Sequence, residues 1–140
     1  MIYTSYYAKI KDLPDNIIPI SIAGKAPKGF KGLQYKKLAP KYSFFSVWKE
    51  TKDNDYYVKC FNEQVLDKLI ASNVVKELGY LCTGYLTENV DIVLICYEKP
   101  SNFCHRHLVA DWLIKNGYEC EEYVYADKWN ERIGQKIKWI

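Results

Sequence analysis

The feature that most constrains the fold is a short apolar run followed at once by a helical pattern, between Asp91 and Gly117. Residues 92–96 read Ile-Val-Leu-Ile-Cys. A run this short and this rich in branched residues is typical of a strand covered on both faces of a parallel sheet. Pro100 ends the strand. From residue 103 the apolar residues recur at helical spacing until Gly117 supplies the stop. The stretch therefore predicts a strand, a loop and a helix.

The start of this expected helix is also where we expect a site. Its N-cap is predicted at Ser101 or Asn102. Its apolar stripe is predicted on residues at helical spacing: Cys104, Leu108 and Trp112, with Val109 and Leu113 beside them. In open α/β sheets, ligands bind where a strand ends and the following helix begins. The first turn of this helix would carry Cys104, His105 and Arg106.

The rest of the chain completes an α/β pattern. The ranges expected to form strands are 2–7, 17–22 and 121–126, and those expected to form helices are 42–50, 56–70 and 72–78. Pro19 favours an edge position or a local irregularity for the second strand. Residues 25–41 are expected to form a long ordered loop, and 80–88 a loop or a weak strand. This order predicts a single α/β domain over residues 1–140, with a mainly parallel sheet flanked by helices in a Rossmann-like three-layer arrangement. Residues 127–140 would be a peripheral tail.

The composition fits one cytoplasmic domain. The chain has 140 residues, of which 49% are hydrophobic and 26% charged, enough for one core. No apolar run approaches the ~20 residues of a membrane span, and the first residues lack the order of a secretory signal. The five cysteines are odd in number and form no C-x-x-C pair. We therefore expect reduced thiols, without a disulfide and without a zinc ribbon or thioredoxin-type motif.

Positive charge is concentrated in the loop. The net charge is +3, but the stretch from Lys25 to Lys41 contains six lysines and no acidic residue. This concentration indicates an anionic partner. The aromatic residues Phe30, Tyr35 and Tyr42 could stack on nucleic-acid bases while the lysines hold phosphates. They could equally be half-buried anchors of the loop, and both interpretations can hold at once.

An anion site at the helix start is the first candidate for function. The unpaired N–H groups of the first turn and the positive end of the helix dipole favour phosphate or carboxylate. Arg106 could add a bidentate fork and His105 a neutral donor or an acid–base group. Lys99 and Lys25 could complete the charge. The alternative is a solvent-exposed helix start that Arg106 merely solubilises.

Glu98 and His105 are the candidate catalytic residues. Glu98 follows the predicted strand by two residues, so it could orient a ligand hydroxyl or ring nitrogen, or work as an acid–base partner of His105 or Asp111. The alternative for Glu98 is a salt bridge to Lys99, Arg106 or a loop lysine.

The same residues could also support thiol or metal chemistry. Cys96 and Cys104 are candidate nucleophiles, but the apolar stripe favours a buried, inert Cys104. Cys96 lies ten positions before Arg106, which does not match a phosphatase-like loop. Adjacent Cys104 and His105 would point about 100° apart on a helix, so they are not expected to share one ion. No metal and no cofactor are predicted.

Residues 96–113, CYEKPSNFCHRHLVADWL, resemble the bacterial, archaeal and phage proteins of domain-of-unknown-function family 488. The family signature is a Cys-x-Glu-Lys strand end followed by a Cys-His-Arg helix start, matched by Cys96, Glu98, Lys99, Cys104, His105 and Arg106. Residues 2–14, 19–23 and 31–42 also resemble its short subgroup. The resemblance implies an α/β fold with the Cys-His-Arg turn facing a pocket, and no reaction. Many members have Asp-x-Arg at the end of the second strand, where this chain has Ser21-Ile22-Ala23.

The resulting prediction is a protein that binds a phosphate-bearing ligand, a nucleotide or a nucleic-acid end. If it is an enzyme, we expect hydrolysis or transfer at a glycosidic or phosphate bond through Glu98 or His105. The residues expected to contact the ligand are Cys96, Lys99, Cys104, Arg106, Ser5, Tyr6, Ser21 and Lys25. The alternatives are a non-catalytic module that sequesters a nucleotide or docks on a protein, and a nucleic-acid binder that uses the basic loop. No membrane partner is expected.

Overall fold

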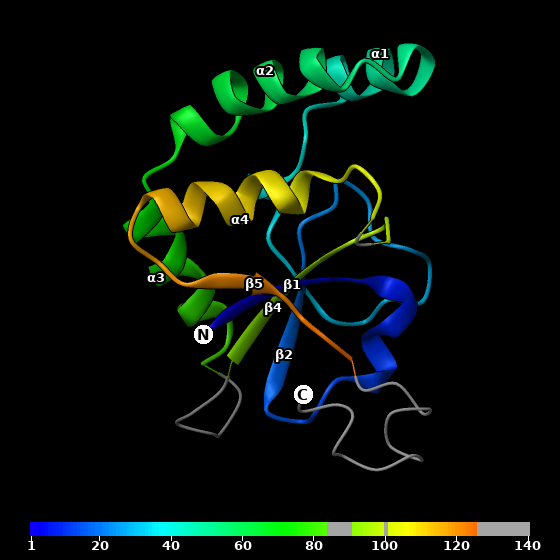
Figure 1. The fold of residues 1–140 in the computed structure, drawn as a ribbon. Helices are drawn as coiled ribbons and strands as arrows, with labels where there is room; N and C mark the ends of the chain where they lie inside the picture. Colours follow the sequence, from blue (N-terminus) through cyan, green and yellow to red (C-terminus); the bar gives the residue numbers. More distant parts are fainter. Residues whose placement is uncertain (84–90, 100, 126–140) are drawn as a thin grey trace, which may run out of the picture.

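The computed structural model of the chain describes residues 1–83, 91–99 and 101–125. Within these residues one five-stranded, all-parallel sheet has the order β3-β2-β4-β1-β5, with several helices stacked above it (Figure 1). The strands are β1 (Ile2–Tyr6), β2 (Ile17–Ser21), β3 (Leu33–Gln34), β4 (Asp91–Cys96) and β5 (Cys120–Glu122). The predicted α/β class with a mainly parallel sheet is confirmed.

The helices lie mainly on one side of the sheet. They are α1 (Tyr42–Thr51), α2 (Asn54–Gln64), α3 (Ala71–Leu81) and α4 (His105–Lys115), with short 3₁₀ turns η1 (Tyr7–Asp12), η2 (Lys36–Leu38) and η3 (Leu66–Lys68). Helix α4 lies directly over the sheet, and α1 and α2 form a further layer beyond it (Figure 1). This stacking places the start of α4 between the sheet and α1.

Strand β4 is the centre of the fold, as its apolar run predicts. It pairs with β2 on one side and β1 on the other, and Val93, Leu94, Ile95 and Cys96 are fully buried. Leu94 belongs to the large core beneath the helices. Val93 and Ile95 belong to a smaller apolar cluster that includes Tyr7 of η1. A strand with apolar neighbours on both faces needs the unbroken run that this one has.

Pro19 does not place β2 at an edge, so of the two alternatives the edge position is wrong. Strand β2 lies between β3 and β4. However, β3 pairs only with Ile20 and Ser21, so the short neighbour ends before it reaches Pro19. The missing N–H of proline is tolerated because no strand is paired with β2 on that side at this position.

The predicted helix over residues 56–70 is confirmed over residues 56–64 and wrong beyond them. Helix α2 ends at Gln64, and Val65 has φ −117° and ψ −68° before the turn of η3. Val65 and Leu66 are buried there. Their apolar side chains therefore pack a turn into the core and do not form the face of a helix. The next helix, α3, starts at Ala71 and continues through Gly79 to Leu81, past the predicted stop.

Helix α4 begins later than predicted and buries a different face. Cys104 is the N-cap, with extended φ −155° and ψ 143°, in place of Ser101 or Asn102. The buried side chains of α4 are those of His105, Arg106, Val109 and Leu113. The sequence pattern placed the stripe one residue earlier because a buried histidine and a buried arginine are rare without polar partners. Both have such partners, as described below.

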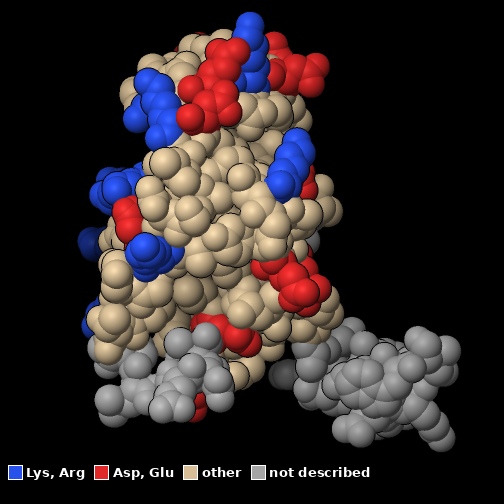
Figure 2. Space-filling model, turned by 90° about the vertical axis from the view of Figure 1, so that its left-hand side faces the viewer, with Lys and Arg blue, Asp and Glu red and all other residues tan. Residues whose placement is uncertain are grey.

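The last strand is shorter than predicted, since β5 ends at Glu122. The predictions for residues 84–88 and for the tail 127–140 lie outside the described residues. In the part of the chain that the structure describes, no helix combines the length and the apolar character needed to cross a bilayer. Figure 2 shows the face that carries α3: its centre is uncharged, and charged side chains lie toward its upper end and its edges.

Candidate functional site

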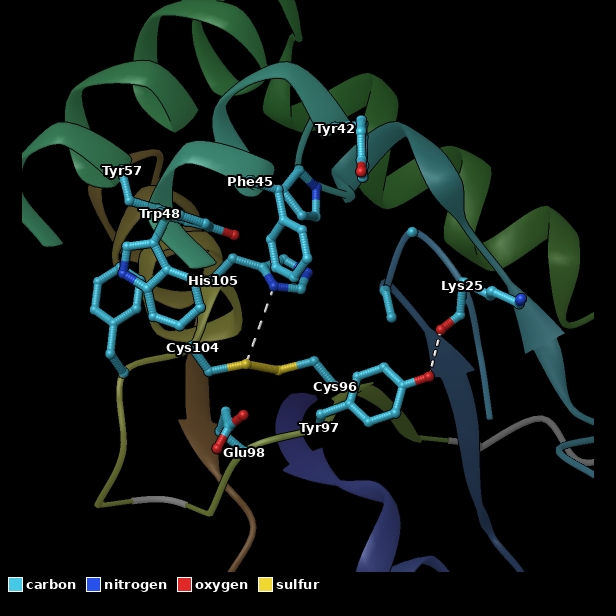
Figure 3. Close-up of a pocket in the computed structure, with 14 residues that line it drawn as sticks. Lys25, Tyr42, Phe45, Trp48, Tyr57, Cys96, Tyr97, Glu98, Cys104 and His105 are labelled. Atoms are coloured by element: carbon cyan, nitrogen blue, oxygen red, sulfur yellow. Dashed lines mark hydrogen bonds between the residues drawn. A yellow bond between two sulfur atoms is a disulfide. The ribbon is translucent and has the colours of Figure 1, made fainter. Parts of the chain in front are cut away.

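A cavity of about 700 Å³ lies where β4 ends and α4 begins. Its lining combines three kinds of residue, shown as sticks in Figure 3. Cys96, Cys104 and His105 form the polar part next to the sheet. Aromatic side chains line much of the rest: Tyr42, Phe45, Trp48, Tyr57, Tyr97 and Phe103. Lys25 and Glu98 are the charged residues of the lining. The site therefore lies at the carboxyl end of the central strand, as the α/β fold predicts.

Cys96 and Cys104 form a disulfide, so the expectation of reduced thiols is wrong for this pair. Their sulfur atoms are 2.00 Å apart and their Cα atoms 7.3 Å apart. The loop between β4 and α4 turns the chain back, so the N-cap of α4 lies beside the last residue of β4. A separation of eight residues carries no local motif, which is why cysteine spacing did not reveal the pair. The other cysteines, Cys60, Cys82 and Cys120, are free and buried.

His105 has a fixed orientation and one free lone pair. Its side chain is buried, and its Nε2 lies 2.7 Å from the carbonyl oxygen of Ile22. A carbonyl can only accept, so Nε2 carries the proton and donates it to Ile22. Nδ1 then holds the lone pair, 4.0 Å from Sγ of Cys104. Burial lowers the pKa of His105 to about 4, so the ring is neutral at pH 7.

The two cysteines and His105 bring three possible metal-ligating atoms together. Ligand atoms of Cys96, Cys104 and His105 all lie within 4.8 Å of one another. The expectation that Cys104 and His105 cannot reach one ion is therefore wrong. It assumed helical geometry at both positions, but Cys104 is an extended N-cap, so the 100° rotation per helical residue does not apply.

Arg106 is fully buried and does not line the cavity. Its Nε and Nη2 donate to the two carboxylate oxygens of Glu122, at 3.0 and 2.9 Å. Its Nη1 donates to the backbone carbonyl of Glu98 at 2.6 Å and to Sγ of Cys96 at 3.2 Å. The guanidinium group, which was expected to bind an anionic ligand, thus binds the carboxylate of Glu122 on β5 instead. Arg106 also connects the end of β4 to β5.

Ser5, Tyr6 and Ser21 lie at the same end of the sheet but outside the cavity lining. Ser5 shares a hydrogen bond of 2.7 Å with the hydroxyl of Tyr125, and Ser21 is hydrogen-bonded to the hydroxyl of Tyr7. The ring of Tyr6 lies 5.7 Å from the guanidinium carbon of Arg106. Both serine hydroxyls are thus bound to tyrosines of the protein, and Tyr6 lies next to the buried arginine.

The charged candidates divide between the cavity and the surface. Glu98 lines the cavity, is exposed, and accepts a hydrogen bond of 3.4 Å from Asn102. Among the described residues it forms no salt bridge. Lys25 lines the cavity, its carbonyl accepts from the hydroxyl of Tyr97, and its ammonium group points away from the rings (Figure 3). Lys99 is exposed and lies outside the lining.

The aromatic wall was not predicted as part of the site. Trp48 lies 5.6 Å, centroid to centroid, from both Tyr57 and Phe103, and Tyr57 lies 5.0 Å from Phe103. The helical pattern of residues 42–50 indicated one apolar face, but of its members Phe44 is buried while Phe45 and Trp48 remain partly exposed. The pattern alone does not distinguish a face that packs in the core from one that lines a cavity.

The basic loop is anchored by its two aromatic residues, Phe30 and Tyr35. Tyr35 is buried and donates to Glu77 at 2.8 Å, and Phe30 packs edge-on against Tyr7 at 5.5 Å. Lys37 also binds Glu77, at 2.9 Å, so one of the six lysines is paired. Tyr42, by contrast, is 79% exposed and lines the cavity. The anchor interpretation therefore holds for Tyr35 and Phe30, while Tyr42 is open to a ligand.

Comparison with known proteins gives one match. The model of family DUF488-N3a, described as the active DUF488-N3 subclade, matches residues 2–117. The matched range contains every residue of the cavity lining. No curated protein and no solved structure matches the chain.

Proposed function

We propose that the cavity of this chain, which belongs to the DUF488-N3a family, binds the base and sugar of a nucleotide. The observation that carries the proposal is the composition of the cavity. About 700 Å³ is enclosed by aromatic side chains, with Glu98 and Lys25 as its charged residues. Small-molecule sites typically have this volume and combine an apolar wall with a few polar groups.

Stacking on the aromatic wall would supply most of the affinity. Each base has a π-face, and stacking on an aromatic side chain is worth about 1–3 kcal/mol per base. The rings of Trp48 and Phe103 are inclined by only 33° to each other, and Tyr42 projects freely beside the cavity. A planar heteroaromatic ring therefore has several faces on which to pack.

The phosphate would lie toward Lys25 and the start of α4. Lys25 is exposed, so its long side chain can turn its ammonium group toward a bound anion. Cys104 and His105 line the cavity at the start of α4, where the first N–H groups form the positive end of the helix dipole. Arg106 has no part in this contact because Glu122 occupies its guanidinium group.

The reaction we assign to the site is hydrolysis or transfer at the glycosidic bond, with Glu98 as the acid–base residue. Phosphoryl transfer needs several cations around the phosphate, and Lys25 is the one cationic side chain among the described lining residues. His105 is neutral at pH 7 and gives its N–H to Ile22, so it serves as an acceptor at Nδ1 rather than as an acid. Glu98 is the carboxylate of the described lining, and a carboxyl group can act as the acid–base residue at a glycosidic bond.

Calorimetric titration with a panel of nucleosides and nucleoside monophosphates tests the binding. Trp48→Leu should weaken binding by about 5-fold or more, because it removes a stacking face. Tyr80→Leu is the matched control, since Tyr80 is 65% exposed on α3 and lies outside the cavity lining. Equal binding by both variants, or no binding of any nucleotide at millimolar concentration, would contradict the proposal.

Chromatography of the same mixtures tests the reaction. The wild-type chain should release free base, and Glu98→Gln should retain nucleotide affinity while losing at least about 100-fold in rate. Recovery of unaltered nucleotide with the wild-type chain would instead identify a non-catalytic nucleotide-binding module. Binding of DNA or RNA that falls steeply with salt and ignores Trp48→Leu would favour the basic loop as a nucleic-acid surface.

A further inference from the structure

The buried Cys-His group at the base of the cavity has an unused acceptor. Nδ1 of His105 holds a lone pair, because Nε2 donates to Ile22. Its polar neighbour is Sγ of Cys104 at 4.0 Å, and a disulfide sulfur carries no proton to donate. A buried acceptor without a donor is costly unless another partner occupies the position. A thiol proton or a metal cation at this position would be such a partner.

The backbone spacing of the two cysteines also leaves room for an ion. Their Cα atoms are 7.3 Å apart, whereas disulfides usually span about 4.4–6.8 Å. A tetrahedral zinc ion, with Zn–S of about 2.3 Å and Zn–N of about 2.0 Å, separates its ligand atoms by roughly 3.5–3.8 Å. The ligand atoms of Cys96, Cys104 and His105 already lie within 4.8 Å of one another. Reduction of the disulfide would let the sulfurs separate to the required distance.

The surroundings of the three residues resemble the supporting contacts of metal sites. A histidine that binds a metal through one nitrogen typically gives its other N–H to a carbonyl or carboxylate, as His105 does to Ile22. Arg106 donates to the sulfur of Cys96 at 3.2 Å, and a charged donor stabilises a thiolate. The charge of Arg106 is balanced by Glu122 at 2.9 Å, so it opposes a nearby cation less than a free arginine would.

We propose that, in the reduced chain, Cys96, Cys104 and His105 bind one Zn²⁺ ion with its fourth position open to the cavity. Two thiolates and an imidazole suit zinc. All three residues line the cavity, and three protein ligands with one open position are typical of catalytic zinc, which activates a bound water. The site does not depend on the organic ligand of the cavity being a nucleotide.

Oxidation state decides whether the site exists. A dithiol reductant gives two electrons and two protons to the Cys96–Cys104 bond and itself becomes a disulfide. Binding of Zn²⁺ to the two thiols then releases their two protons to water. With the disulfide formed, as in the structure, the sulfurs have no thiolate to offer. The chain therefore alternates between a metal-binding dithiol and a disulfide that does not bind the ion.

Titration of the reduced, metal-stripped 140-residue chain with Co²⁺ tests the proposal, with Co²⁺ as a spectroscopic substitute for zinc. One equivalent should produce the visible bands of tetrahedral cobalt and a sulfur-to-cobalt charge-transfer band, and Zn²⁺ should abolish both because it binds more tightly. Cys96→Ser, Cys104→Ser and His105→Gln should each weaken binding by roughly 100-fold or more. Cys60→Ala, which changes a buried thiol outside the cavity, should leave the titration unchanged, and the oxidised chain should show no sulfur band.

X-ray absorption at the zinc edge, measured on the wild-type chain, identifies the zinc ligands even if a variant fails to fold. The reduced wild-type chain should show two sulfur neighbours and lighter nitrogen or oxygen neighbours around zinc. A first shell without sulfur, or a cobalt spectrum that survives Cys96→Ser and Cys104→Ser, would overturn the metal site. The cobalt and zinc measurements test the metal site, and the nucleotide titrations test nucleotide binding. Failure of one proposal therefore does not decide the other.

Discussion

At the scale of single residues, His105 shows how burial selects a protonation state. Its ring lies beneath the cavity with Nε2 bound to Ile22, and desolvation is the main cause of its lowered pKa. A neutral ring can present a lone pair at Nδ1, which a charged ring cannot. The same burial makes the residue a source of pH-dependent stability.

The free energy of unfolding should fall as the pH is lowered from about 6.5 to about 4. In the unfolded chain His105 takes up a proton near its ordinary pKa of 6.5, whereas in the folded chain its pKa is about 4. The unfolded state thus binds more protons in this window and gains stability as the pH falls. The full effect is on the order of 3 kcal/mol, measured by urea denaturation at a series of pH values.

His105→Gln is the control for this effect, because an amide can still donate to Ile22 and does not titrate. Its unfolding free energy should depend less steeply on pH. Some slope should remain, since burial also lowers the pKa of His107. A variant with the same pH profile as the wild-type chain would show that His105 is not buried as described.

At the scale of elements, the ion pair of Arg106 and Glu122 joins α4 to β5. Arg106 is fully buried and makes two hydrogen bonds to the carboxylate, to which Thr4 of β1 also donates at 2.6 Å. Glu122 lies opposite Thr4 in the ladder between β1 and the edge strand β5. A short strand of three residues is thereby fixed to the rest of the fold by side chains as well as by its backbone.

Arg106→Met should destabilise the fold by about 3–5 kcal/mol, because it leaves the Glu122 carboxylate partly buried without its partner. Denaturant unfolding measures this loss. The double change Arg106→Met with Glu122→Leu should recover part of it, since no unpaired charge remains. Nucleotide affinity measured on the folded fraction should change little, because Arg106 lies outside the cavity lining. A loss of affinity with unchanged stability would instead return Arg106 to the ligand site.

At the scale of the whole molecule, the sequence predicts where the cavity lies but not which aromatic residues line it. The run at 92–96 and the helix after it are local patterns, and the structure has both as β4 and α4. The two cysteines, Glu98, His105 and Lys25 were also predicted to lie together, and they do line one cavity. These predictions succeeded because the carboxyl end of a parallel strand has a fixed place in an α/β fold.

The remaining features depend on contacts between distant segments. Trp48 and Tyr57 line the cavity because α1 and α2 pack beyond α4, an arrangement that no local pattern specifies. The partner of Arg106, Glu122, lies sixteen residues away on β5. Whether the guanidinium group of Arg106 faces a ligand or a carboxylate depends on which acceptor the fold brings next to it. Sequence alone gives the donor but not which acceptor reaches it.

The nitrogen–proton NMR spectrum of the indole groups, recorded during titration with a nucleoside monophosphate, tests the central claim most directly. Trp48 lines the cavity, while Trp112 lies farther along α4 and outside the lining. We predict that the Nε1–H resonance of Trp48 shifts in proportion to occupancy and that of Trp112 stays in place. Saturating nucleotide that leaves the Trp48 resonance unmoved would contradict the account.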